Sequence, residues 1–213
     1  LFPYTTLFRS WLKEPSRVAG EASIKFCTDA IAAARAGIID GIVTAPISKA
    51  SWKMADATWP GHTELFAQKC KSPRKAMMFV AGPLKVALAT IHLGLFDIRN
   101  KFTIGCVFEP IDLLNDALKE YFGIENPHIG VAGLNPHAGE QGQFGDEEDR
   151  IIKPAILLAQ EQGIDCTGPI PADALFVVNH NDLHVSLLLR GSSIQNNVPP
   201  PTGLLAQIAP PWR

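Results

Sequence analysis

The chain has 213 residues, 46% of them hydrophobic and 19% charged, which is an ordinary globular composition that allows one or two domains with a sizeable core. The formal net charge is -2, and the lysines and arginines are scattered rather than arranged along one face. This charge pattern argues against a nucleic-acid partner.

The first expected element is a helix over residues 17–36. The segment is rich in alanine, and Ile24, Cys27 and Ile31 recur near helical spacing. We expect Gly37 to end this helix.

A buried strand is predicted next, over residues 40–44 (DGIVT). This short β-branched run is closed by Ala45 and Pro46, as in the strands of α/β layers. A helix is expected from Ser48. After the break at Pro60-Gly61, residues 62–64 are expected to open another helical stretch over residues 65–70, with Thr63 able to act as its cap.

The later segments alternate between strands and helices. The most apolar region, 76–96, is interrupted by Gly82-Pro83 and Lys85, so it reads as two short strands around a turn and not as a membrane span. The remaining expected elements are an amphipathic helix over 109–122 bearing Ile111, Leu114, Leu118 and Phe122 on one face, a strand over 129–132, and a helix over 146–162. This alternation predicts an α/β fold.

The two ends of the chain do not fit this pattern. Residues 1–13 resemble a translated adaptor more than natural coding sequence, and residues 177–213 show no settled period and a proline cluster. The expected organisation is therefore a foreign-looking segment (1–13), an α/β core (14–176) and an atypical tail (177–213), either disordered or out of frame.

Four cysteines lie far apart, with no CxxC spacing and no secretory signal pattern before them. Reduced thiols in a cytoplasmic location are the simplest expectation.

The most informative motif is GLNPHAGE, residues 133–140. His137 stands in a polar loop after a predicted strand, beside Asn135 and between glycines, where an imidazole can be presented to a metal or a substrate. The alternative is that His137 only hydrogen-bonds its own loop.

The glycine-rich loop that follows is not a GxGxxG dinucleotide fingerprint. The helix after it begins with Asp146, Glu147 and Glu148, which favour the helix dipole but would repel a pyrophosphate. A Rossmann site is therefore not expected here.

A second motif is PGHTE, residues 60–64. The N–H groups of a helix start, the Thr63 hydroxyl and the His62 imidazole together can hold an anionic group. The alternative is an ordinary helix cap with a solvated histidine.

Three further side chains carry weaker signals. Lys49 follows a predicted strand, where ligands of open α/β sheets bind, but it is equally read as a surface lysine. His92 is interpreted as packed or hydrogen-bonded, and His128 as a solvated residue at a strand edge.

Taken in order, these segments resemble one family. GIVTAPISKA, PGHTELFAQKC, MMFVAGPLKVALATIHLGL, GLNPHAGEQGQFGDEE and GPIPADALF are similar in order and spacing to the 4-hydroxythreonine-4-phosphate dehydrogenases, from about Ala34 to Phe176. The resemblance implies an isocitrate/isopropylmalate dehydrogenase-like fold, incomplete in this chain, which binds NAD without the Rossmann fingerprint.

The resemblance also implies roles for three residues. His137 would be a ligand of the divalent metal (zinc, magnesium or cobalt), and His62 and Thr63 would contact the phosphorylated substrate. The family's YHDQG-type segment is absent, and the surroundings of His180 and His184 do not match it, so neither histidine is assigned as a ligand. The resemblance thus implies an enzyme whose active site is incomplete in this chain.

The implied reaction is NAD-dependent (or NADP-dependent) oxidation, with subsequent decarboxylation, of 4-(phosphooxy)-L-threonine to 3-amino-2-oxopropyl phosphate in vitamin B6 synthesis. The implied assembly is a cytoplasmic homodimer whose active sites are completed across the interface. Two alternatives remain open: a paralogous dehydrogenase of a phosphorylated sugar acid or cyclic diol carboxylate, and a non-catalytic truncated fragment.

Overall fold

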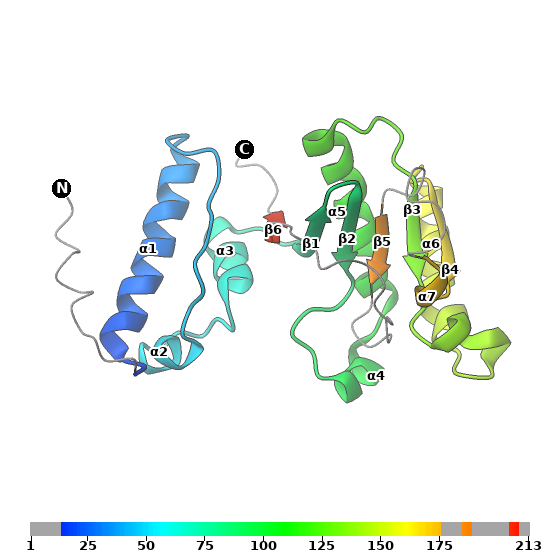
Figure 1. The fold of residues 1–213 in the computed structure, drawn as a ribbon, viewed down its shortest axis with the longest axis horizontal. Helices are drawn as coiled ribbons and strands as arrows, with labels where there is room; N and C mark the ends of the chain where they lie inside the picture. Colours follow the sequence, from blue (N-terminus) through cyan, green and yellow to red (C-terminus); the bar gives the residue numbers. More distant parts are fainter. Residues whose placement is uncertain (1–13, 176–184, 189–204, 209–213) are drawn as a thin grey trace. The chain divides into compact units, whose positions relative to one another are not determined.

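The structure is a computed structural model that describes residues 14–175, 185–188 and 205–208. The described residues fall into two compact units, one up to Pro73 and one from Arg74 to Ile208 (Figure 1). Each unit is described by itself. The expected core of residues 14–176 is thus divided between them.

The first unit is helical. Its helices are α1 (Arg17–Arg35), α2 (Lys49–Met54) and α3 (His62–Cys70). The predicted helices at these three places are confirmed, and Gly37, with a φ of 67°, follows the end of α1 as expected.

Glycine brings α1 and α2 together. A Cβ on Gly20 would lie 2.1 Å from the carbonyl oxygen of Ser51, so only glycine allows this approach. Trp52 on α2 is 2% exposed, and its indole N–H donates to the hydroxyl of Ser23 on α1 at 2.5 Å. This hydrogen bond fixes the position of the Trp52 ring, which contacts His62.

The predicted strand over residues 40–44 is wrong. This segment has no strand structure, and Val43 is 88% exposed. A β-branched run becomes a strand only where another strand supplies hydrogen bonds. Among the described residues of the first unit there is no strand to pair with it.

The second unit is built on a mixed sheet in the order β4-β3-β5-β2-β1-β6. Strand β1 runs antiparallel to β2 and β6, and the other neighbours are parallel. The strands are β1 (Ala76–Ala81), β2 (Leu84–Leu88), β3 (Ile129–Ala132), β4 (Cys166–Ile170), β5 (Val185–Leu188) and β6 (Leu205–Ile208). The predicted hairpin is β1–β2, and the predicted strand over 129–132 is β3.

Two long helices, α5 (Ile104–Phe122) and α6 (Lys153–Glu161), pack on each other and on the sheet. Ile111, Leu114 and Leu118 are buried as predicted, whereas Phe122 is 37% exposed. Their apolar face forms the main core together with Ile129 and Val131 of β3. The short helical segments are η2 (Leu95–Asp97), α4 (Ile98–Lys101), η3 (Pro136–Gly142), η4 (Glu148–Ile152) and α7 (Ala172–Leu175).

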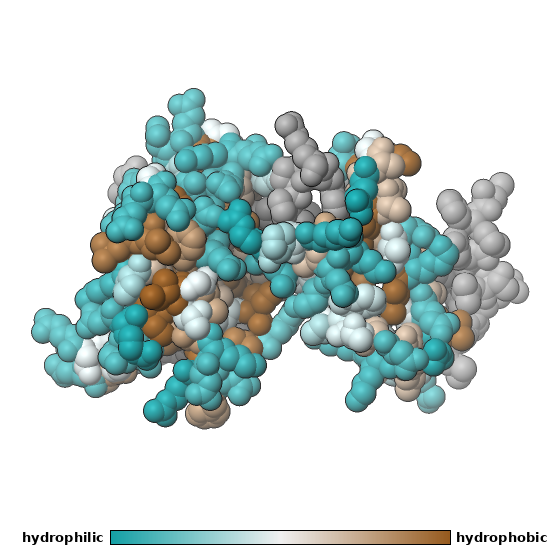
Figure 2. Space-filling model, turned by 180° about the vertical axis from the view of Figure 1, so that it is seen from behind, coloured by the Kyte–Doolittle hydropathy of each residue, from teal (hydrophilic) through white to brown (hydrophobic). Residues whose placement is uncertain are grey.

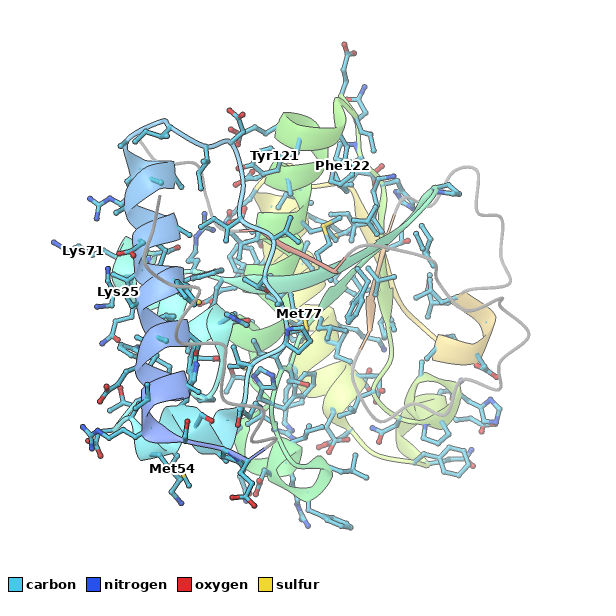
Figure 3. The ribbon with its side chains drawn as sticks, turned by 60° about the vertical axis from the view of Figure 1, so that its left-hand side comes forward. Lys25, Met54, Lys71, Met77, Tyr121 and Phe122 are labelled. Atoms are coloured by element: carbon cyan, nitrogen blue, oxygen red, sulfur yellow. The ribbon has the colours of Figure 1, made fainter. Side chains whose placement is uncertain are left out.

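The surface seen from behind is mostly hydrophilic, with apolar residues in small patches (Figure 2). Tyr121 and Phe122 mark the last turn of α5 (Figure 3), where the Lys85 ammonium lies 5.1 Å from the centre of the Phe122 ring. In the described part of the chain, no helix is long and apolar enough to cross a bilayer. The four cysteines are free thiols.

The tail expected over residues 177–213 includes β5 and β6, whose backbones pair within the sheet. The other residues of this segment, and residues 1–13, lie outside the described part. Their foreign or atypical character stays a prediction.

Candidate functional site

His137 lies in the loop that follows β3. The side chain is exposed, and its ring centre lies 6.1 Å from that of Phe144. Residues 137–141 all have positive φ values, from 42° to 80°, although only Gly139 among them is a glycine. Left-handed backbone is unfavourable for other residues, so this conformation must be held by its surroundings.

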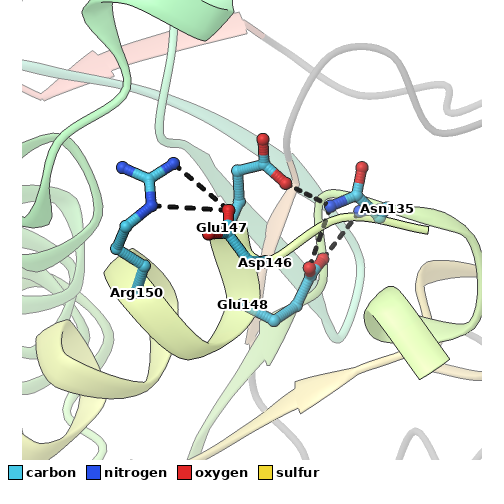
Figure 4. A network of polar contacts seen from close by, with 5 residues as sticks. All are labelled: Asn135, Asp146, Glu147, Glu148 and Arg150. Carbon is cyan, nitrogen blue, oxygen red and sulfur yellow. Dashed lines mark hydrogen bonds and ion pairs between the residues drawn. The ribbon is translucent and has the colours of Figure 1, made fainter. Parts of the chain in front are cut away.

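A buried carboxylate accepts hydrogen bonds from the start of this loop (Figure 4). Glu148 is 3% exposed. Its Oε1 accepts the backbone N–H groups of Leu134 at 2.8 Å and Asn135 at 2.7 Å, and its Oε2 accepts the Asn135 side-chain amide at 2.9 Å. The same amide nitrogen donates to Glu147 at 2.8 Å. Glu148 therefore ties the beginning of η4 to the loop of His137.

Two glycines make room for this network. A Cβ on Gly139 would lie 2.7 Å from Oε2 of Glu148, and a Cβ on Gly145 would lie 2.5 Å from Oε2 of Glu147. Any side chain at either place would push a carboxylate out of its hydrogen bonds. Gly139 and Gly145 thus allow the loop to pack closely around two carboxylates.

The described residues do not by themselves form a metal site. No three His, Cys, Asp or Glu side chains in the described part of the chain are close enough to hold an ion. His137 is a single exposed imidazole, and a catalytic zinc site usually needs three protein ligands. His180 and His184 lie outside the described residues.

His62 and Thr63 begin α3, in the first unit. Gly61 precedes the helix and provides no side-chain cap, so the predicted capping role of Thr63 is wrong: Thr63 lies inside the first turn and is 6% exposed. The N–H groups of this turn therefore receive no hydrogen bond from a capping side chain, and N–H groups at a helix start are common anion-binding groups in proteins.

The imidazole of His62 lies between two aromatic rings. Its centre is 5.6 Å from that of Trp52, which meets it edge-on, and 5.9 Å from that of Phe66. Burial lowers the pKa of His62 from its ordinary value of 6.5. The ring is therefore neutral at pH 7 and offers one N–H donor.

A cavity of about 1000 Å³ lies beside His62 within the first unit. It is lined by α1, by residues 42–47 and by His62, and its walls are mainly apolar. Lys49 does not line it and is exposed at the start of α2. The segment expected to be a strand thus forms a wall of this cavity instead.

One of the two weaker histidines differs from its interpretation. His92 is exposed, with a φ of 55°, and its interpretation as packed or hydrogen-bonded stays a prediction. His128 is not simply solvated: Nδ1 lies 2.9 Å from an Asp165 carboxylate oxygen, and Nε2 lies 3.2 Å from the Thr167 hydroxyl. It links the start of β3 to β4.

The structure thus assigns the predicted site residues to both units, His62 and Thr63 to the first and His137 to the second. Sequence reasoning missed Trp52 and the Asn135–Glu148 contact. Their only sequence signals were a tryptophan in a short helix and an acidic run after a glycine-rich loop.

Comparison with known proteins agrees with these motifs. The family model "Pyridoxal phosphate biosynthetic protein PdxA" matches residues 5–188, past both expected boundaries of the core. The 4-hydroxythreonine-4-phosphate dehydrogenase of Desulforapulum autotrophicum is 42% identical over 168 residues, which cover 78% of this chain and 49% of that protein. The D-threonate 4-phosphate dehydrogenase of Bordetella bronchiseptica is 42% identical over 161 residues, which cover 76% of this chain and 46% of that protein.

A solved structure is similar as well. The 4-hydroxythreonine-4-phosphate dehydrogenase of Klebsiella pneumoniae aligns with a TM-score of 0.77 and 34% identity, over 83% of this chain and 55% of that one. The chain spans about half the length of the relatives that it matches. The matched region includes both the PGHTE and the GLNPHAGE motifs, and the chain belongs to the PdxA family of pyridoxal phosphate biosynthetic proteins.

Proposed function

We propose that this chain is part of a dehydrogenase that oxidises 4-(phosphooxy)-L-threonine with NAD or NADP and decarboxylates the product to 3-amino-2-oxopropyl phosphate, in vitamin B6 synthesis. The observation that carries this proposal is the family match over residues 5–188, which contains both site motifs. The proposed fold is that of the isocitrate/isopropylmalate dehydrogenases, and the proposed location is the cytoplasm.

In this proposal, His62 and Thr63 bind the phosphate group of the substrate. The first turn of α3 has no side-chain cap, and phosphate oxygens accept hydrogen bonds from such N–H groups. The neutral His62 ring adds a donor whose orientation is set by Trp52 and Phe66. The contact is therefore made by neutral donors and the helix dipole.

The proposed role of His137 is that of one ligand of a divalent metal, zinc, magnesium or cobalt. Its exposure leaves the imidazole accessible. The remaining ligands must come from outside the described residues, either from the rest of a longer chain or from the second subunit of a homodimer. The nicotinamide cofactor supplies the hydride acceptor of the reaction.

A second candidate is a dehydrogenase of a phosphorylated sugar acid. The relative from Bordetella bronchiseptica that favours this reading is a D-threonate 4-phosphate dehydrogenase, with an identity equal to that of the first relative. Both substrates carry a terminal phosphate, so the roles proposed for His62 and Thr63 hold for either. The difference lies at the carbon that bears an amine in one substrate and a hydroxyl in the other.

The experiment joins this chain to the part of a family member with which it does not align and measures NADH formation with both substrates. The proposal predicts a higher kcat/KM with 4-hydroxythreonine 4-phosphate; a preference for D-threonate 4-phosphate would favour the second candidate. In the same protein, Thr63→Ala is expected to raise the KM and leave the fold intact. An unchanged KM would remove Thr63 from the phosphate site.

A further inference from the structure

One buried carboxylate stands apart from the acidic run in which it lies. Asp146 pairs with Arg150 at the surface, and Asp149 pairs with Lys153, each four residues along the helix. Glu148 instead turns inward and accepts three N–H groups from Leu134 and Asn135. Its contacts are therefore with the loop of His137 and not with its own helix.

Burying a carboxylate is unfavourable unless hydrogen bonds replace its water. Three N–H donors at 2.7–2.9 Å provide this replacement. Hydrogen bonds to a charged acceptor are the stronger ones in proteins, so the bonds that keep Glu148 buried also hold residues 134 and 135 in place.

The loop needs such an anchor because its backbone is strained. Six successive residues, 137–142, have positive φ values. This run begins one residue after the anchored pair, beyond Pro136, and the Ala138 N–H donates back to the Asn135 carbonyl at 3.1 Å. Fixing Asn135 therefore fixes the point from which the strained segment starts.

We propose that Glu148 is a positioning residue, which acts through Asn135 to hold the backbone that carries His137 before any ligand binds. The inference rests on the proposed function in one respect, which is that the proposed function makes His137 a metal ligand. The orientation of the Asn135 amide is set by two carboxylate acceptors, Glu147 and Glu148, because only its NH₂ group can donate to them.

Glu148→Gln is the most direct test of this role. The oxygen of the introduced glutamine can still accept the two backbone N–H groups. The NH₂ group of the glutamine then faces the NH₂ group of Asn135, and two donors cannot form a hydrogen bond with each other. Adding Asn135→Asp restores a donor–acceptor pair with reversed direction. Glu147 is only half-buried and can turn to solvent in that double variant.

The measurement is nuclear magnetic resonance of the 213-residue chain without metal. Glu148→Gln is expected to lower the exchange protection of the Leu134 and Asn135 amides by about tenfold, because their hydrogen bonds then go to a neutral acceptor and the link to the Asn135 side chain is lost. The ring signals of His137 should shift toward those of an unstructured histidine, while the amides of β3 keep their shifts. The double variant should recover the parent His137 signals.

Asp146→Asn is the matched control, because it makes the same acid-to-amide change at an exposed neighbour and is expected to leave the His137 signals as they are. If Glu148→Gln does not fold, Asn135→Ala removes only the side-chain link and should still move these signals. The proposal is overturned if the folded variants keep the parent His137 signals, or if Asp146→Asn changes them equally. Because no metal or substrate is present, a failure of the proposed function would leave this result unaffected.

Discussion

Gly139→Ala tests the close approach between the loop and Glu148 in energetic terms. Gly139 has a φ of +80°, and an added Cβ would lie 2.7 Å from a Glu148 carboxylate oxygen. The left-handed backbone costs an alanine roughly 1–2 kcal/mol. Displacing the carboxylate removes at least one hydrogen bond to a charged acceptor, which is about 1.5–3 kcal/mol more. We expect a total loss of roughly 2.5–5 kcal/mol in the opening free energy of the second unit.

Gly142→Ala is the matched control within the same loop. Gly142 has a φ of +91°, and nothing lies within 4 Å of an added Cβ. Gly142→Ala should therefore lower the opening free energy only by the cost of left-handed backbone for an alanine, roughly 1–2 kcal/mol. The assay is native-state hydrogen exchange of the β3 amides, which reports the opening free energy of the surrounding structure. Equal losses in the two variants would refute the reasoning, because the carboxylate contact would then add nothing.

Two further predictions concern the first unit and the core. Burial lowers the pKa of His62 below 6.5, so the unfolded chain binds the proton more tightly than the folded chain does. The contribution of the neutral ring to the free energy of unfolding should therefore be complete above about pH 6.5 and should be lost as the pH falls through the lower pKa of the folded state. A His62→Gln variant should lose this pH dependence in urea unfolding, and an unchanged dependence would contradict the assignment. Leu118 is 0% exposed, and Leu118→Ala should lower the free energy of unfolding by about 2–5 kcal/mol. Leu157 is 58% exposed, and Leu157→Ala should change it by no more than about 0.5 kcal/mol. Similar losses in the two variants would contradict the packing of α5 and α6.

The helices were predictable because their signals are local. The amphipathic spacing of α5 places Ile111, Leu114 and Leu118 on one face, and that face is buried. Ser16 and Ser48 cap α1 and α2 with side-chain hydrogen bonds, as serine commonly does. Such patterns need no information about distant segments.

The strand expected over residues 40–44 failed because a strand depends on a partner. A β-branched run favours extended backbone, but the hydrogen bonds of a strand must come from another segment. No strand in the described part of the first unit supplies them. Thr63 failed as a cap for a local reason, since the capping position lies two residues earlier, at Gly61, and the helix begins at His62. Helix boundaries are commonly uncertain by such a margin.

The candidate site could be proposed from its histidines, whereas the residues that support them could not be predicted. His62 and His137 were singled out because imidazoles in glycine-flanked motifs are distinctive. The supporting contacts join residues that are distant in sequence. Glu148 contacts Asn135, 13 positions away, and Trp52 contacts His62, 10 positions away. In sequence, Glu148 reads as one of several helix-start acids, and only its burial separates it from Asp146 and Asp149.

The central proposal is that His137 is one ligand of an active-site metal whose other ligands come from outside the described residues. The most direct measurement compares zinc titration calorimetry and NADH formation for this chain, for the chain joined to the part of a family member with which it does not align, and for the joined chain with His137→Ala. We expect weak binding and little turnover in the short chain, recovery of both in the joined chain, and loss of both with His137→Ala. Full activity in the His137→Ala protein, or tight zinc binding and normal turnover by the short chain, would contradict the account.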